Sequence, residues 1–145
     1  MNLADFTLVA AAGFLATYVH MLFALWAPQY GLPRLDFPKM LNDLSFSASF
    51  KDEPPYWLGL IALHLNGILF ALLYATIVGP VLPGAGFIRG LIYGGILFFG
   101  SQCLFVPIFI RGGFFGLKHS SRGWMTAIVV HAVYGIILGW LSPVL

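Results

Sequence analysis

Charged side chains are scarce in this 145-residue sequence: Asp, Glu, Lys and Arg make up 8% of it. An ordinary soluble domain has about 25%. Hydrophobic residues make up 60% and aromatic residues 17%. With so few charges, the chain cannot cover a globular surface with polar groups. The composition therefore excludes a soluble globular protein, a disordered tail and a nucleic-acid-binding protein, and it predicts an integral membrane protein that contacts lipid.

Cysteine is almost absent as well, because Cys103 is the only one. One cysteine cannot form an intrachain disulfide, which excludes a secreted disulfide scaffold. The formal net charge of +2 is too small to indicate a polyanionic partner. No Lys or Arg precedes the first apolar run, so we interpret this run as a retained helix and not as a signal peptide.

Four apolar runs each approach the ~20 residues that a helix needs to cross a membrane. Arg89 is the one charged residue within them, and Pro107 predicts a kink near the end of the third run. Lipid tolerates only helices and closed barrels, and these runs lack the alternation of barrel strands. The sequence therefore predicts an all-α protein with a single domain over 1–145. Its four-transmembrane-helix bundle is expected over 7–27, 57–78, 87–110 and 124–141.

Basic residues in the loops predict the orientation of this bundle. Six of the seven Lys and Arg residues lie in the loops before the second and fourth helices. Loops rich in Lys and Arg stay on the cytoplasmic side. We therefore expect these two loops to be cytoplasmic, with both termini outside, in the inner (cytoplasmic) membrane of a bacterium. The six residues are Arg34, Lys39, Lys51, Arg111, Lys118 and Arg122.

The first loop contains a short amphipathic segment over 37–48. Asp36 suits the N-cap and Pro38 suits the first turn, and apolar residues follow at helical spacing. Two interpretations are open: an interfacial helix that lies on the membrane or docks a partner, and a lid folded over the ends of the bundle. The apolar residues are Phe37, Met40, Leu41, Leu44 and Ala48.

Small residues recur at four-residue spacing in all four predicted membrane helices. Such residues let helices approach closely in lipid, where burial of apolar surface drives little association. We therefore expect close helix contacts, either within the chain or with other subunits. The predicted packing residues are Ala12, Ala16, Gly67, Ala71, Gly90, Gly94, Gly135 and Gly139.

Three histidines lie on these same faces and at a similar depth. His20, His64 and His131 are seven or eight residues from the predicted cytoplasmic ends of their helices. Gln102 is nine residues from the corresponding end of the third helix. At ~1.5 Å per residue, all four lie roughly 10–14 Å below that boundary. The sequence thus predicts one polar layer that crosses the bundle.

This layer has several possible roles. The three imidazoles can hold a transition metal with an open fourth position. Two of them can ligate haem b between facing helices, with Gln102 as a further cofactor-binding candidate. A buried histidine can also serve a proton or quinone site. The alternative is a structural layer of hydrogen bonds between helices.

The second and fourth helices share a motif, with His64-x-x-Gly67 in one and His131-x-x-x-Gly135 in the other. This pattern resembles small, functionally uncharacterised four-helix proteins of the bacterial inner membrane, over most of the chain. The resemblance implies an architecture, and it assigns no catalytic residue.

The sequence favours an accessory or structural subunit of a larger membrane complex, without catalytic activity of its own. The grounds are the lack of a soluble domain, the small-residue faces, and an aromatic content of 14 Phe, 6 Tyr and 4 Trp. Expected partners are lipid and other membrane subunits or further copies of the chain, but not nucleic acid. The first alternative is a haem- or metal-binding membrane protein that uses His20, His64 and His131. The second is a small transporter or a proton or quinone site.

Overall fold

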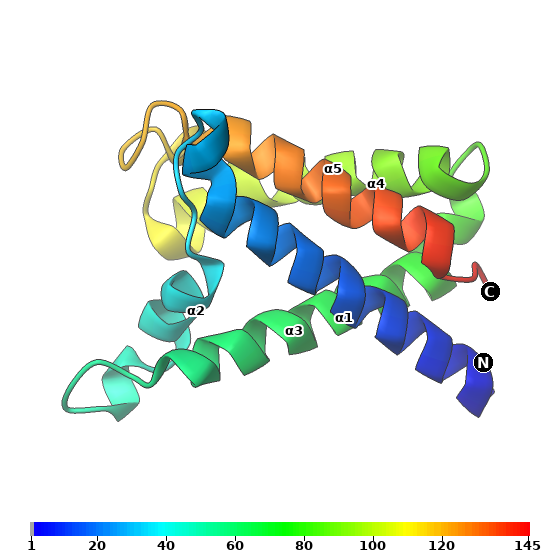
Figure 1. Ribbon diagram of the computed structural model, residues 1–145, viewed down its shortest axis with the longest axis horizontal. Helices are drawn as coiled ribbons and strands as arrows, with labels where there is room; N and C mark the ends of the chain where they lie inside the picture. Colours follow the sequence, from blue (N-terminus) through cyan, green and yellow to red (C-terminus); the bar gives the residue numbers. More distant parts are fainter. Residues whose placement is uncertain (1) are drawn as a thin grey trace.

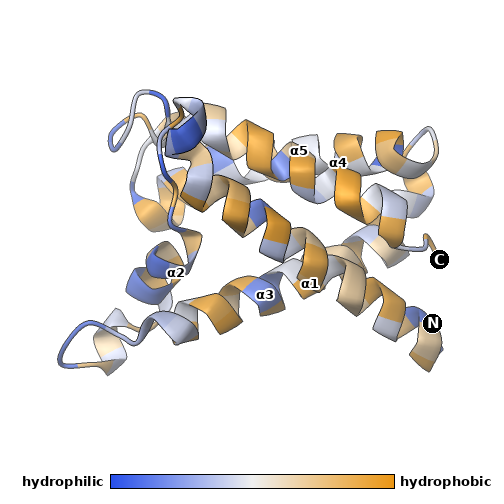
Figure 2. Ribbon diagram, viewed as in Figure 1, coloured by the Kyte–Doolittle hydropathy of each residue, from blue (hydrophilic) through white to orange (hydrophobic). Residues whose placement is uncertain are grey.

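The computed structural model describes residues 2–145, which form helices and no strands. Four helical segments are long and apolar enough to cross a membrane: Leu3–Tyr30, Tyr56–Val81, Gly86–Ile110 and Gly123–Leu141. Figure 2 shows hydrophobic residues along all four. The all-helical prediction and the four candidate spans are therefore confirmed.

Five α-helices form the framework: α1 (Leu3–Trp26), α2 (Phe37–Ser45), α3 (Tyr56–Leu73), α4 (Gly86–Gly100) and α5 (Gly123–Leu141). Two π-helical segments lengthen the apolar helices, because η3 (Tyr74–Val78) continues α3 and η5 (Ser101–Ile110) continues α4. Short 3-10 turns fill the ends and loops: η1 (Ala27–Tyr30), η2 (Ser47–Ser49), η4 (Gly79–Val81) and η6 (Phe114–Gly116).

The first helix begins four residues earlier than the apolar run predicts. The side chain of Asn2 accepts a hydrogen bond from the Asp5 amide at 2.9 Å, and the Asp5 carboxylate accepts one from the Asn2 amide at 3.2 Å. This capping box satisfies free amides of the first turn. A polar start therefore extends α1 beyond its hydrophobic part.

The predicted kink at Pro107 takes the form of the π-helical segment η5. Proline has no N–H and crowds the preceding turn, so an α-helix cannot continue through it unchanged. The wider turns of η5 contain Pro107 and end at Arg111, whose φ of 56° lies in the left-handed region. The Arg111 amide closes the segment by donating to the Val106 carbonyl.

Among the long helices, α4 packs most extensively on α5, and α1 packs on both α3 and α5. In Figure 1, α1 crosses α3 while α4 and α5 run side by side. Both termini lie at one end, and α2 lies at the other. At the α2 end, Arg122 donates to the Gly31 carbonyl at 3.2 Å, and Thr126 donates to the Pro33 carbonyl at 2.7 Å. The two basic loops therefore meet at the same end of the molecule.

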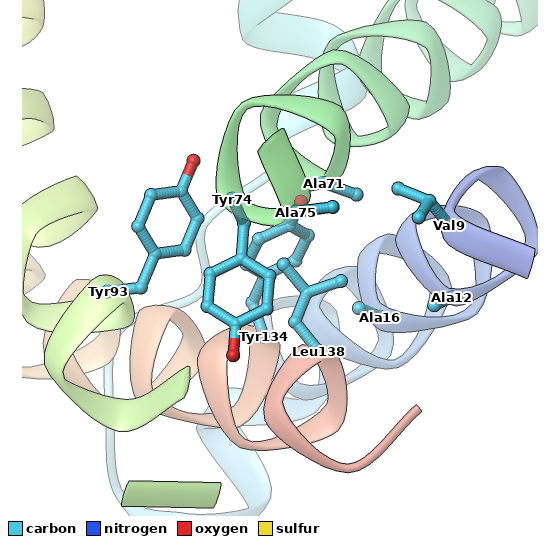
Figure 3. Packing of buried hydrophobic residues seen from close by; sticks show 9 residues of the cluster. All are labelled: Val9, Ala12, Ala16, Ala71, Tyr74, Ala75, Tyr93, Tyr134 and Leu138. Carbon is cyan, nitrogen blue, oxygen red and sulfur yellow. The ribbon is translucent and has the colours of Figure 1, made fainter. Parts of the chain in front are cut away.

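Small residues and tyrosines form the buried core shown in Figure 3. The alanines of α1 and α3 let these two helices approach closely, and Tyr74, Tyr93 and Tyr134 fill the space toward α4 and α5. The cluster consists of Val9, Ala12, Ala16, Ala71, Tyr74, Ala75, Tyr93, Tyr134 and Leu138.

Glycines bring the backbones of α4 and α5 together. A Cβ atom on Gly135 would meet the Gly90 carbonyl oxygen and lie 3.0 Å from the Gly94 Cα. A Cβ atom on Gly139 would lie 2.9 Å from the Phe87 Cα. The small-residue faces predicted from the sequence therefore meet one another within the chain.

Candidate functional site

A cavity of about 400 Å³ lies among the helices, at the place where α3 turns away from α4 and α5. All five α-helices and the start of η5 contribute to its wall. No charged side chain lines it, and its polar groups are few. The polar side chains are those of Thr17, His20, Asn66, Ser101, His131 and Tyr134. The larger apolar ones are Phe37, Met40, Leu41, Leu63, Phe70, Ile96, Leu97 and Phe105.

His20 and His131 come together in this wall. Their ring centroids are 5.7 Å apart and the ring planes meet at 84°. His20 is buried, and on its other side it stacks against Phe37 of α2, with the centroids 4.7 Å apart. Contact between α1 and α5 thus joins two of the three histidines that the sequence placed at one depth.

A backbone hydrogen bond fixes the orientation of His131. Its Nδ1 lies 2.7 Å from the Ala127 carbonyl oxygen, one turn earlier in α5. A carbonyl oxygen can only accept, so Nδ1 carries the proton and donates. In the neutral ring, Nε2 then has a free lone pair. His131 therefore offers the cavity a hydrogen-bond acceptor.

His20 has a ring nitrogen that is buried without a partner. Its Nδ1 makes no hydrogen bond to any residue between 2 and 145. A buried polar atom that lacks a partner costs about 1–3 kcal/mol. The hydrogen-bonding capacity of this ring is therefore not satisfied within the described residues.

Gln102 reaches the cavity indirectly. Its side chain is buried, and its Nε2 donates to the Ser101 hydroxyl at 3.3 Å. Ser101 lines the cavity and Gln102 does not. Gln102 can therefore orient a cavity hydroxyl.

His64 lies apart from the other two histidines. Its Nδ1 donates to the Leu60 carbonyl at 2.8 Å, and its ring packs against Phe14 with the centroids 4.6 Å apart. Within residues 2–145, no group of three His, Cys, Asp or Glu side chains is placed to hold a metal ion. The predicted three-histidine ligand set is therefore not assembled in this structure, and haem or metal binding stays a prediction.

Two tyrosines, not assigned this role from the sequence, connect α3 to α4 and α5. Tyr134 donates to the Gly67 carbonyl at 2.6 Å, and Tyr93 donates to the Phe70 carbonyl at 2.8 Å. Gly67, Phe70 and Tyr134 line the cavity. These bonds join the helices beside the cavity. Tyrosines within apolar runs are the only sequence signal for them.

The short helix α2 covers one side of the cavity. Phe37, Met40 and Leu41 of its apolar stripe line the wall. The Asn42 amide donates to the carbonyls of Pro54 and Pro55 at 3.3 and 3.0 Å, which attaches α2 to the start of α3. This arrangement is the one expected of a lid, and the position of α2 on a membrane surface stays a prediction. The helix is shorter than the predicted 37–48, because a 3-10 turn follows Ser45.

Comparison with known proteins found no match to a family model, a curated protein or a solved structure. The resemblance to small bacterial inner-membrane proteins therefore stays a prediction.

Proposed function

We propose that this chain is an integral membrane protein that binds a small, largely apolar molecule in the cavity, with the polar end of that molecule at His20 and His131. The cavity volume of about 400 Å³ falls within the range of small-molecule sites. Such sites are lined mainly by apolar side chains with a few polar groups, and in helical bundles they lie between the helices.

The observation that carries this proposal is the pair of histidines in a cavity wall without charged side chains: Nδ1 of His20 is buried without a partner, and Nε2 of His131 is free to accept a hydrogen bond. His64 and His131 each donate from Nδ1 to a backbone carbonyl. Nε2 of His64 is also buried without a partner, but His64 does not line the cavity. His20 instead shares the wall with the free acceptor of His131. A ligand that bonds to both rings would account for their placement.

The outer surface supports the membrane location. Leu65 and Leu69 of α3 are each 62% exposed and Ile77 of η3 is 63% exposed, on a helical segment with a mean hydropathy of 2.0. Water disfavours such a surface and lipid does not. The bundle is proposed to lie in a bacterial inner membrane, with the two basic loops and α2 at the cytoplasmic face.

Single cysteines test this orientation in a Cys103→Ser background. Ser49→Cys in the first loop and Val81→Cys at the other end both place a thiol at an exposed position. A membrane-impermeant maleimide added to intact cells is expected to label Val81→Cys, and to label Ser49→Cys only after the membrane is opened. The reverse pattern would overturn the orientation.

Two glycines of α4 provide a matched test of the cavity. A Cβ atom would find open space at both Gly95 and Gly100, but only Gly100 lines the cavity. We expect Gly100→Leu to fill the cavity while the helix is retained, and Gly95→Leu to leave the cavity open. Mass spectrometry of organic extracts from the purified proteins then compares bound small molecules.

A molecule that copurifies with the original chain and with Gly95→Leu, but not with Gly100→Leu, would support the proposal. Equal amounts in all three proteins would contradict it, because binding would not depend on the cavity. Absorption spectra and metal analysis of the same samples test the haem and metal alternative.

The second candidate function is that of an accessory subunit in a larger membrane complex. Its support from small-residue faces is weaker, because α1 with α3 and α4 with α5 use these faces within the chain. Exposed aromatic residues remain in its favour, such as Trp140 at 70% and Phe114 at 66% exposure. Purification in mild detergent tests it, since a stable partner would copurify.

A further inference from the structure

The two cavity histidines together have more free hydrogen-bond acceptors than free donors. His131 uses its one proton on the Ala127 carbonyl, which leaves Nε2 as an acceptor. A second proton on this ring would create a charge among side chains that include no Asp or Glu. An isolated charge in such an environment is costly, so the neutral ring is favoured.

His20 adds one donor and one acceptor, as any neutral imidazole does. Together the two rings therefore offer two acceptors and one donor. A molecule that can only accept, such as a ketone, ether or quinone, would leave the His131 acceptor without a partner. A hydroxyl group can donate to one ring and accept from the other.

Aromatic side chains surround the two imidazoles. Phe37 stacks on His20 with the planes inclined by 24°, and Phe98 lies edge-on to His131 with the centroids 6.1 Å apart. Phe37, Phe70 and Phe105 line the cavity, and Phe98 does not. Aromatic walls favour a flat ring, because stacked and edge-to-face contacts add to the burial of its area.

On the basis of the proposed function, we infer that the bound molecule is a ring compound with a hydroxyl group, as in a phenol or a quinol, whose O–H donates to Nε2 of His131. The corresponding methyl ether or quinone has the same ring but lacks the donor, and the site discriminates against it.

Two matched probes test it: 4-propylphenol and its methyl ether, 4-propylanisole. Equilibrium dialysis against the full chain in nanodiscs measures binding, and empty nanodiscs correct for partition into lipid. One hydrogen bond predicts that the phenol binds about three- to tenfold more tightly than the ether. Equal affinities, or tighter binding of the ether, would overturn the inference while the cavity remained a binding site. Saturable binding of neither probe would count against the proposed function itself.

The histidines supply matched variants. His64 and His131 both donate to a carbonyl one turn earlier, but only His131 lines the cavity. We expect His131→Leu to abolish the preference for the phenol and His64→Leu to retain it. Retention of the preference in a folded His131→Leu protein would contradict the assignment.

A spectroscopic measurement on the unaltered protein makes the test independent of how well the variants fold. Nitrogen-15 NMR of labelled histidine distinguishes a protonated ring nitrogen from an unprotonated one. We expect Nδ1 of His131 to be protonated and Nε2 to be unprotonated, and we expect the Nε2 signal to shift when 4-propylphenol is added. A protonated Nε2 before ligand is added would overturn the inference.

Discussion

The imidazole rings of His20 and His131 meet edge to face, with their centroids 5.7 Å apart and their planes at 84°. One belongs to α1 and the other to α5, and both line the same cavity. His131 has a backbone partner, whereas the buried Nδ1 of His20 has none in the described part of the chain. A buried polar atom without a partner reduces the stability of the empty protein. Groups that reduce stability in this way are common at functional sites.

Replacement of His20 by leucine is therefore expected to leave the empty protein equally stable or to stabilise it by about 1 kcal/mol, because an unpaired polar atom is removed. The same change is expected to weaken 4-propylphenol binding. Circular dichroism during SDS titration measures the free energy of unfolding, and Met21→Leu serves as a control at the neighbouring buried position. A loss of more than 1 kcal/mol in His20→Leu would show that the ring is structural.

Gly135→Ala is expected to destabilise the protein by about 1–3 kcal/mol, the usual cost of overpacking. A Cβ atom there would meet the Gly90 carbonyl oxygen, and backbone cannot move aside as a side chain can. Gly95→Ala is the control, because open space surrounds its Cβ position and alanine favours the helix by roughly 0.5–1 kcal/mol. Thermal unfolding in the same detergent compares the two variants, and equal melting temperatures would contradict close packing of α4 on α5.

The depth of each histidine along its helix was predictable from the sequence. The direction in which its side chain points around the helix was only partly predictable. His20 and His131 lie at one depth and meet. His64 was expected at the same depth, yet it belongs to α3, which crosses α1 and turns away from α5 (Figure 1). Its ring therefore packs against Phe14. The crossing angle of two helices depends on the whole contact surface, and residue spacing along one helix does not determine it.

Local signals differ in how directly they determine structure. The Asp36 cap and the apolar stripe of α2 were readable, because capping and helical spacing act within a few residues. The π-helical turns around Pro107 could not be predicted, because a helix can accommodate the hydrogen bond lost at a proline either by a bend or by a wider turn. The cavity itself depends on five helices at once, and no short segment encodes it.

Lys39 links α2 to the chain that leads into α3. Its ammonium group donates to the Glu53 carboxylate and lies 3.8 Å from Asp43. The hydrogen bond to Glu53, aided by nearby carboxylates, raises the pKa of Lys39 above its ordinary value of 10.5. A raised lysine pKa means that the contact contributes fully below about pH 10.5 and is lost as the pH rises through the folded-state value.

A spin label on Ser45→Cys, in a Cys103→Ser background, is therefore expected to report an ordered α2 at pH 8 and a more mobile one at a pH above the raised pKa of Lys39. Lys39→Met should show the mobile spectrum at both values, and high salt should shift the original chain toward it, because the pair is exposed to solvent. Lys118→Met in the third loop is the control. Spectra that do not change with pH would exclude this role for Lys39.

The covering position of α2 leads to a prediction about ligand exchange. The Pro38 carbonyl lies against Gly59 of α3, where a Cβ atom would come within 2.7 Å of the carbonyl carbon. The carbonyl carbon and oxygen of Pro38, which the new Cβ atom would meet, belong to the backbone of α2. Gly59→Ala can therefore be accommodated only if α2 moves away from α3. The side chains of Phe37, Met40 and Leu41 then withdraw from the cavity wall that they now form.

We expect 4-propylphenol to dissociate about tenfold faster from Gly59→Ala, which corresponds to ~1.4 kcal/mol and lies within the usual cost of overpacking. Asn42→Ala should act in the same direction, because it removes the donor to the Pro54 and Pro55 carbonyls. Gly95 does not line the cavity and a Cβ atom there meets open space, so Gly95→Ala should release the phenol at the original rate. Dissociation is followed by rapid dilution of loaded nanodiscs. If both α2 variants released the phenol at the original rate, the ligand would have to leave by another route, and α2 would be a fixed part of the wall.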